Sequence, residues 1–383
     1  TDYDLAPYPI ELGAEFIHGG RVVTWDALRE VSLSGSSEVL GYAESVLYVN
    51  GELIRYPAWA NRFELEAYEG VYEVAEEWVD EGYPDATVLA LVQQELAGLS
   101  LAEPVNVELI NNLFAPDYGV GLSQLGIYGL VEATFAGDGN ADYRVIEGYS
   151  RLMQAMANEV GVSYNQVVRS IDWGRDGIVA RTDSGSFEAA RCIVTIPLSL
   201  LKNGSIAFNP GLPAPKWDAI NRIATANVLK VILEFEQAAW PEDIGVITTD
   251  LPTQIWWRPG FGQPNEVPVW TALIGETTSN EISTMSEEAA VQFALNDLVT
   301  ILGPQVREAL IGGRVVNWQQ DPFTRMGYSY VPVGATGQRA VLAEALDDTL
   351  YFAGEATHVI RPGTVHGAIE SGWRAVDEIL ASL

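Results

Sequence analysis

The sequence predicts a mixed α/β protein with two domains, and three observations support this class. The chain has 383 residues, of which 48% are hydrophobic, enough to bury the cores of two ordinary domains. Strand-like runs bounded by glycine turns stand next to helical segments in the middle of the chain and again near its C-terminal end. Other long stretches repeat apolar residues at three- and four-residue spacing, as amphipathic helices do.

The individual elements follow from these patterns in chain order. An apolar face with acids opposite indicates a helix, and apolar runs between turns such as Asp176-Gly177 and Ser184-Gly185 indicate strands. The predicted elements are a short strand over 10–17, helices over 64–79, 86–99 and 149–160, strands over 167–173, 178–182, 192–196 and 349–353, and a C-terminal helix over 365–380. The last strand, its glycine turn and the helix present backbone N–H groups to an electron-rich ligand.

The formal charge of the chain is −31, from 52 acidic and 21 basic residues. A field of this sign repels nucleic acid and anionic membranes, so neither is expected as a partner, whereas a cationic ligand is attracted. The alternative interpretation is that the acids only keep the protein soluble or adapt it to salt. Cys192 is the single cysteine and the three histidines are scattered, so no metal site is predicted.

The sequence also bears on where the protein acts. It contains no run of about 20 apolar residues, the length that a membrane-spanning helix requires. The first residues, Thr1-Asp2-Tyr3-Asp4, carry acids where a signal peptide has bases. We therefore expect a soluble protein, cytoplasmic rather than secreted.

The most specific motif lies near the C-terminus, in Phe352-Ala353-Gly354-Glu355-Ala356-Thr357 and Gly363-Thr364-Val365-His366-Gly367-Ala368. Small residues let the backbone approach a flat ligand, and a helix that begins near Val365 directs its positive end toward that ligand. The order and spacing closely resemble the flavin-proximal motif of the flavin amine oxidase family, which includes monoamine, polyamine and L-amino acid oxidases and histone lysine demethylases. The resemblance implies FAD as the cofactor, with contacts from Gly354, Glu355, Ala356, Gly363, Thr364 and Val365. In the family the Gly-Glu pair follows the phosphate and ribityl chain, and the Thr-Val pair meets the isoalloxazine ring.

Lys230 stands in the apolar strand-like run Val228-Leu229-Lys230-Val231-Ile232-Leu233. Because burial of an unpaired ammonium is costly, such a lysine either reaches water or takes part in chemistry. The run resembles the Asn-x-x-Lys strand of amine oxidases, downstream of Pro197-Leu198-Ser199-Leu200-Leu201-Lys202. The resemblance implies that Lys230 is catalytic and holds a water at flavin N5, where it serves oxygen reactivity or imine hydrolysis.

Further stretches resemble substrate and cofactor elements of the same family. Trp318-Gln319-Gln320-Asp321-Pro322 with Tyr328-Ser329-Tyr330 matches Trp-x-x-Asp-Pro…Tyr-Ser-Tyr, which implies Tyr328 as a wall of the amine pocket and Trp318 as a cofactor contact. An aromatic wall suits a cation because the ring face is electron-rich. Thr364 stands where monoamine oxidases have the opposing tyrosine and where histone demethylases and animal spermine oxidases have threonine.

Two more positions come from the same resemblance. Gly13-Ala14-Glu15-Phe16-Ile17-His18 is similar to Gly-Ala-x-Trp-Ile-His of polyamine oxidases, which implies that His18 faces the substrate. Val168 stands where the family backbone meets the adenine of FAD. The substrate-binding residues implied are therefore His18, Tyr328 and Thr364.

The resemblance predicts a two-domain flavin amine oxidase-like fold. Its discontinuous FAD-binding domain is expected over 1–23, 138–212 and 337–383, and its substrate-binding domain over 24–137 and 213–336. The family's opening strand, Gly-x-Gly-x-x-Gly turn and helix do not occur in this sequence, so the FAD-binding domain is expected to be incomplete. A fragment, a second polypeptide and a loss of FAD binding each explain this difference. Without that strand, Ile193, Val194 and residues 350–352 are expected to be exposed.

The predicted function is FAD-dependent oxidation of a C–N bond in a small cationic amine, with a polyamine preferred. Hydride passes from the carbon next to a neutral amine nitrogen to flavin N5, and molecular oxygen accepts the electrons, which gives an imine or aldehyde, an amine and hydrogen peroxide. The first alternative is an L-amino acid oxidase, whose carboxylate partner would be Arg258 or Arg361. An alternative of another class is an FAD-free amine-binding or scaffold protein.

Overall fold

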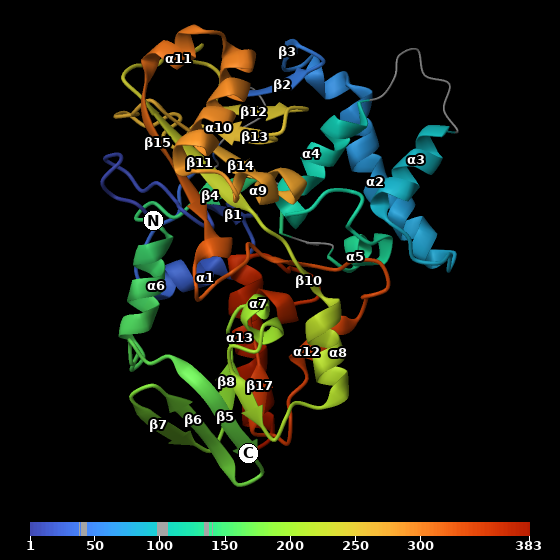
Figure 1. Cartoon of the computed structure of the whole chain (residues 1–383), viewed down its shortest axis with the longest axis vertical. Coiled ribbons are helices and arrows are strands. Elements are labelled where there is room, and N and C mark those ends of the chain that lie inside the picture. Colours follow the sequence, from blue (N-terminus) through green and yellow to red (C-terminus); the bar gives the residue numbers. More distant parts are fainter. Residues whose placement is uncertain (38, 40–43, 98–105, 134–137, 140) are drawn as a thin grey trace.

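The computed structural model describes residues 1–37, 39, 44–97, 106–133, 138–139 and 141–383. The protein has two halves, an upper one around a large sheet and a lower one around a strand meander and the C-terminal helix (Figure 1). The predicted mixed α/β class is confirmed. Within the described ranges, no helix is both long and apolar enough to cross a membrane.

A seven-stranded sheet organises the upper half, in the order β15-β11-β14-β13-β12-β2-β3. Its strands are β2 (Ser45–Val49), β3 (Glu52–Arg55), β11 (Leu229–Phe235), β12 (Val246–Thr249), β13 (Ile255–Trp257), β14 (Val269–Ile274) and β15 (Leu310–Asn317). β11 lies between two partners and is apolar almost throughout, as a strand buried on both faces should be. Lys230 is its buried cation, paired across the sheet with Leu273 and Val316.

Helices cover this sheet and supply much of its core. α10 (Glu287–Leu302) begins at Ser286, whose hydroxyl accepts a hydrogen bond from the amide of Ala289, and it buries its apolar face against the sheet. The other helices of this half are α2 (Phe63–Asp80), α3 (Val88–Ala97), α4 (Val107–Tyr118), α5 (Ile127–Glu132), α9 (Glu276–Ile282) and α11 (Gln305–Ala309). α2 and α3 confirm the two predicted N-terminal helices, except that residues 98 and 99 lie outside the described ranges.

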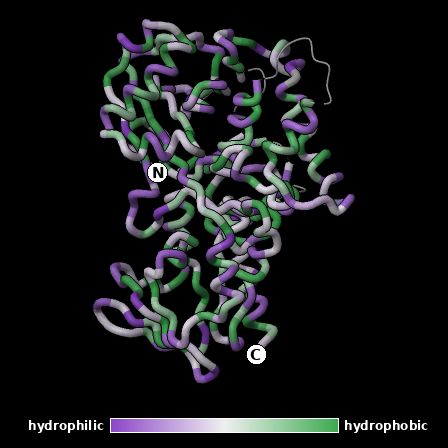
Figure 2. Tube along the Cα trace, turned by 45° about the vertical axis from the view of Figure 1, so that its right-hand side comes forward, coloured by the Kyte–Doolittle hydropathy of each residue, from purple (hydrophilic) through white to green (hydrophobic). Residues whose placement is uncertain are grey.

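The lower half contains a four-stranded sheet, β7-β6-β5-β9, and a parallel pair, β8 and β17. Figure 2 shows hydrophobic residues running through both halves, with hydrophilic ones at the outer turns. The strands are β5 (Val168–Gly174), β6 (Gly177–Thr182), β7 (Gly185–Ala189), β8 (Cys192–Val194), β9 (Ala207–Asn209) and β17 (Leu350–Phe352). The helices are α7 (Leu198–Lys202), α8 (Ala214–Arg222), α12 (Gln338–Ala343) and α13 (Val365–Ala381), with the short η4 (Glu355–Thr357).

The predicted exposure of the apolar strand residues is wrong for most of them. Leu350, Tyr351 and Phe352 are at most 1% exposed and Val194 is also buried, while Ile193 is partly buried. The reason is that packing comes from both faces of the β8–β17 pair. Tyr351 packs with Ala375 of α13, and the other face joins a cluster with residues of α7, α8 and α12.

Short elements join the halves. β1 (Phe16–His18) pairs with β4 (Asp142–Arg144), and β10 (Ala224–Thr225) pairs with β16 (Ser329–Tyr330). α1 (Thr24–Glu30) contacts α13 and α6 (Tyr149–Asn158), and α8 packs on α12. Both α1 and α8 were assigned by sequence to the substrate-binding segments, yet they lie against the lower half. The division into two domains stays a prediction.

Candidate active site

Tyr328 lies where the two halves meet, just before β16. Its hydroxyl donates a hydrogen bond to the carbonyl of Pro116 in α4, and its ring packs beside Gly363, where an added Cβ would lie 3.5 Å from the ring. Burial raises the pKa of Tyr328 well above its ordinary value, so the hydroxyl stays neutral. A cavity of about 10 Å³, close to one water in size, is lined here by Asp117, Tyr118, Tyr328, Ser329, Arg339 and Gly363 among others.

Asp117 is the charged group of this region. Burial and the nearby Asp142 carboxylate raise the pKa of Asp117 to about 6, although His18 acts in the opposite direction. The side chain of Asp117 nevertheless reaches solvent, so it lies in a partly enclosed recess. Tyr68 donates a hydrogen bond to it at 3.3 Å. In the part of the chain that the structure describes, no basic side chain forms an ion pair with Asp117.

His18 lies close enough to Asp117 for their charges to interact, and the pairing of β1 with β4 places it opposite Asp142. Its Nδ1 lies 2.8 Å from Asp142 Oδ1, and 55% of its side chain is exposed. Loss of water around the ring opposes its charging, but the hydrogen bond and charge of Asp142 outweigh this and raise the pKa of His18. The structure thus brings His18 within electrostatic reach of Asp117, and its substrate role stays a prediction.

Aromatic rings form a wall behind Asp117. Tyr68 packs on Phe114 with ring centroids 4.8 Å apart, and the hydroxyls of Tyr72 and Tyr118 lie 3.4 Å apart. These side chains come from α2 and α4, and the rings themselves pack in the core that the two helices share. A carboxylate beside aromatic rings is an arrangement that attracts an organic cation.

Of the two options that the sequence offered for Lys230, an ammonium that reaches water is wrong, and a role in chemistry stays a prediction. Its ammonium neither reaches water nor is free of partners: Nζ lies 3.0 Å from Glu15 Oε2 and donates at 3.0 Å to the carbonyl of Glu11. It also lies 5.0 Å from the centroid of the Trp257 ring. The correction has a physical cause, because a carboxylate brought from the N-terminal segment compensates the buried charge. The role of Lys230 at the cofactor stays a prediction.

Two further predicted cofactor contacts, Trp318 and Val168, begin η3 (Trp318–Gln320) and β5. The indole N–H of Trp318 donates to the carbonyl of Leu12 at 2.9 Å, and its ring packs against Gly13. Trp318 therefore contacts the same N-terminal segment that holds Lys230. Val168 begins β5, in the strand meander of the lower half (Figure 1). Both roles stay predictions.

The start of α13 has the geometry expected of a site for an electron-rich ligand. Thr364 is the N-cap and its hydroxyl accepts a hydrogen bond from the amide of Gly367 at 3.0 Å. Helix geometry leaves the first amides, those of Val365 and the next residue, without partners within the helix. Gly363 adopts a left-handed φ of +71°, and an added Cβ at Gly367 would lie 2.0 Å from the carbonyl of Arg361. Glycine is required at both positions.

The carboxylate of Glu355 holds this turn in place. It accepts hydrogen bonds from the amide of Gly363 at 2.9 Å and from the hydroxyl of Ser329 at 2.7 Å. The buried Arg339 donates to the same hydroxyl at 2.6 Å. Both hydrogen bonds go to Oε2 of Glu355 and fix the orientation of its carboxylate.

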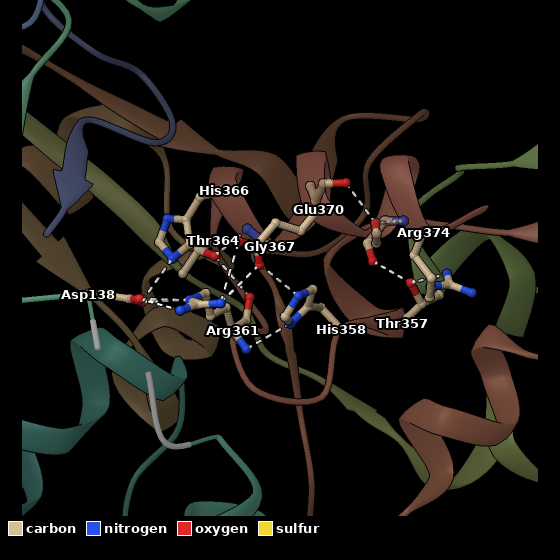
Figure 3. A network of polar contacts seen from close by, with 12 residues as sticks. Asp138, Thr357, His358, Arg361, Thr364, His366, Gly367, Glu370 and Arg374 are labelled. Carbon is tan, nitrogen blue, oxygen red and sulfur yellow. Dashed lines mark hydrogen bonds and ion pairs between the residues drawn. The ribbon is translucent and has the colours of Figure 1, made fainter. Parts of the chain in front are cut away.

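Figure 3 shows a second polar network beside Thr364. Arg361 binds the carboxylate of Asp138 at 2.5 Å and that of Glu370 at 3.2 Å, and His358 contacts Glu370 at 2.9 Å. Arg258 is similarly occupied by Glu266 and by backbone carbonyls. Neither arginine that the sequence offered for a substrate carboxylate is therefore available in this arrangement.

The comparisons with known proteins agree with this geometry. The sequence matches the family described as flavin containing amine oxidoreductase over residues 2–380. The chain belongs to this family. Lysine-specific histone demethylase 1 homolog 1 of Oryza sativa subsp. japonica is 33% identical over 241 residues, which cover 61% of this chain and 28% of that protein. Lysine-specific histone demethylase 2 of Homo sapiens is 29% identical over 260 residues, 65% of this chain and 31% of that protein. The match spans under a third of each relative.

Solved structures show the fold. A putrescine oxidase with bound putrescine superposes with a TM-score of 0.82 at 19% identity, over 97% of this chain and 88% of that one. Cyclohexylamine oxidase from Brevibacterium oxydans gives 0.81 at 17% identity, over 98% and 88%. The predicted flavin amine oxidase-like fold is thereby confirmed.

The family uses FAD. The residues of this chain suit one end of that cofactor, the flavin ring. The start of α13, with Thr364 and Val365, suits the electron-rich edge of a flavin ring. The Gly-x-Gly-x-x-Gly turn that suits the pyrophosphate does not occur in the 383 residues. Binding of FAD by this chain is therefore part of the proposal below.

Proposed function

We propose that this protein oxidises a small di- or polyamine with FAD as cofactor and molecular oxygen as acceptor. The observation that carries the proposal is the recess in which Asp117 meets the Tyr328 and Gly363 pair. One wall belongs to the segment predicted to face the flavin, and the opposite wall presents a carboxylate without a basic partner among the described residues. The enclosed part of this recess, about 10 Å³, holds only one water, so a second ammonium is expected at its open side, where Asp117 is exposed to solvent.

The chain's own residues have separate roles in this proposal. Tyr328, fixed by Pro116 and Gly363, forms the flat wall against which the reacting amine is oriented. Asp117, with Asp142, attracts the cation and keeps it in the recess. Bound FAD would supply the redox chemistry, taking a hydride from the carbon next to the neutral nitrogen and passing its two electrons to oxygen. Water then hydrolyses the imine, and the products are an aldehyde, an amine and hydrogen peroxide.

Comparison of charges favours an amine over an amino acid. An L-amino acid brings a carboxylate that requires a cation, but Arg258 and Arg361 already hold carboxylates. The recess is lined by the carboxylate of Asp117 and by the buried guanidinium of Arg339, which already donates to Ser329 and to the carbonyl of Ala356, and the chain carries a formal charge of −31. A substrate carboxylate in this recess would be repelled by Asp117.

The test is a substrate panel measured by peroxide and aldehyde release after incubation of the protein with FAD. Putrescine, spermine, an N-methyl-lysine peptide and L-leucine are compared at equal concentration. We expect turnover of putrescine or spermine and none of L-leucine; the reverse order would overturn the proposal. If no flavin binds while calorimetry detects stoichiometric spermine, the FAD-free binding protein replaces it.

A further inference from the structure

A single buried carboxylate, that of Glu15, holds the ammonium of Lys230. Glu15 precedes β1 and Lys230 lies in β11, 215 residues later, and only 4% and 6% of their side chains are exposed. The Glu15 carboxylate also accepts hydrogen bonds from the Arg144 side chain at 3.1 Å and from the Trp257 indole at 2.9 Å. One carboxylate therefore serves two cations and one neutral donor.

The charges around Lys230 come from several elements. Glu15 and the Glu11 carbonyl contact it from the N-terminal segment, Trp257 presents a ring from β13, and Arg144 of β4 shares Glu15. The carboxylate of Glu11 faces elsewhere, toward the Thr1 hydroxyl and the Tyr149 amide. Burial opposes the charge of Glu15, but Lys230 and Arg144 outweigh it and lower the pKa of Glu15. The cluster holds one more positive than negative charge.

We propose that Glu15 is the positioning residue of Lys230, which it fixes as an oriented ammonium that acts as a hydrogen-bond donor and not as a base. An ammonium has three N–H donors, and Glu15 and the Glu11 carbonyl occupy two of them. The third remains for a water or for a developing negative charge. This catalytic consequence rests on the proposed function, whereas the orientation of Lys230 does not.

Geometry separates this role from simple stabilisation. A buried ion pair often contributes little net stability compared with apolar residues of the same volume. Replacement of Glu15 would leave the buried Lys230 and the partly buried Arg144 without their shared carboxylate, so the ammonium loses the contact that orients it. Glu11 offers a matched control, since it is equally buried at 6% and lies in the same segment, but its side chain does not contact Lys230.

The first test observes Lys230 directly, by nitrogen NMR of the ammonium groups in protein labelled at lysine. The chain has only three lysines, Lys202, Lys216 and Lys230, so the Lys230→Met variant assigns the signal. We expect a slowly exchanging ammonium signal that disappears in Glu15→Gln and persists in Glu11→Gln. An unchanged signal in Glu15→Gln would overturn the proposal. If Glu15→Gln does not fold, Glu15→Asp takes its place, with faster exchange expected and unchanged exchange contradicting the role.

The second test uses the flavin-loaded enzyme and separates its two half-reactions by stopped flow. Glu15→Gln should slow reoxidation by oxygen roughly 10–100-fold, as misplacement of a positioned group does, and Glu15→Asp should restore part of the rate. Glu11→Gln should leave reoxidation near the wild-type rate. Equal slowing in both Gln variants would indicate a structural effect and contradict the positioning role. If the protein takes up no flavin, the proposed function fails while the NMR result still decides the orientation.

Discussion

Replacement of Asp117 by asparagine removes the charge of the recess and keeps the shape of the side chain. An ammonium about 4 Å from a carboxylate is stabilised by about 1 kcal/mol in water and about 4 kcal/mol at a protein surface. Because Asp117 is exposed to solvent, we take about 2 kcal/mol for the stabilisation of the bound ammonium by its carboxylate. Loss of this stabilisation corresponds to a roughly 30-fold loss of affinity. We expect this loss for putrescine, whose second ammonium reaches Asp117, and under about threefold for butylamine, which has no second ammonium.

The assay is calorimetric titration of the two amines into wild-type protein and Asp117→Asn, at several pH values. Because a cation prefers the ionised carboxylate and the pKa of Asp117 is raised to about 6, wild-type affinity for putrescine should fall as the pH drops through that value. The affinity of Asp117→Asn should change less over the same range. Asp176→Asn, in the exposed β5–β6 turn, controls for the loss of one negative charge. Equal putrescine affinity in Asp117→Asn and the wild type would refute the reasoning.

The same variant should gain stability. A carboxyl whose folded-state pKa lies above its unfolded value of 3.8 makes the folded state less stable as the pH rises from that value to about 6. Asp117→Asn should therefore raise the melting temperature at pH 7.5 and have little effect near pH 4. A lower melting temperature at pH 7.5 would mean that Asp117 is needed for the fold and not for the ligand.

Three further predictions concern stability. Lys216 donates hydrogen bonds to the carbonyls of Val341, Leu342 and Glu344 at the end of α12. Lys216→Met should therefore lower the free energy of unfolding, measured by chemical denaturation, by about 2–4 kcal/mol. The more exposed Lys202→Met should lower it by less than about 1 kcal/mol. Burial lowers the pKa of His366 from 6.5 to about 4. The unfolded chain therefore binds the proton first, and the stability of the protein should fall as the pH drops between these values. In thermal melts, the melting temperature of His366→Gln should fall less over the same range. Gly119→Ala should lower the melting temperature, because φ is +71° and the new Cβ would lie 2.4 Å from that of Ala226; an unchanged melt would contradict the geometry.

Local motifs in the sequence predict much of the fold and part of the candidate site. The strand, glycine turn and helix near Thr364 can be read from neighbouring residues, because the glycines and the N-cap act within a few positions. Tyr328 packs on Gly363 in the structure, and the roles that the family resemblance implied for the two residues stay predictions. Periodicity found α2 and α3 for the same local reason.

Contacts between distant segments could not be predicted in this way. Glu15 stands inside the motif that identified His18, yet nothing in the pattern shows that it meets Lys230 from 215 residues away. Asp117 follows a proline at the end of α4 and carries no local signal at all. The burial of Leu350 to Phe352 was also missed, because it depends on α13 and on helices packed from the other face.

The most direct test of the central claim is a visible spectrum of the FAD-incubated, desalted protein, recorded without oxygen before and after addition of putrescine. We expect the protein to retain a flavin band that bleaches with putrescine and returns on admission of air. In Asp117→Asn the band should bleach only at a much higher putrescine concentration. A band that stays unchanged with every di- and polyamine, or bleaches equally in wild type and Asp117→Asn, would contradict the claim.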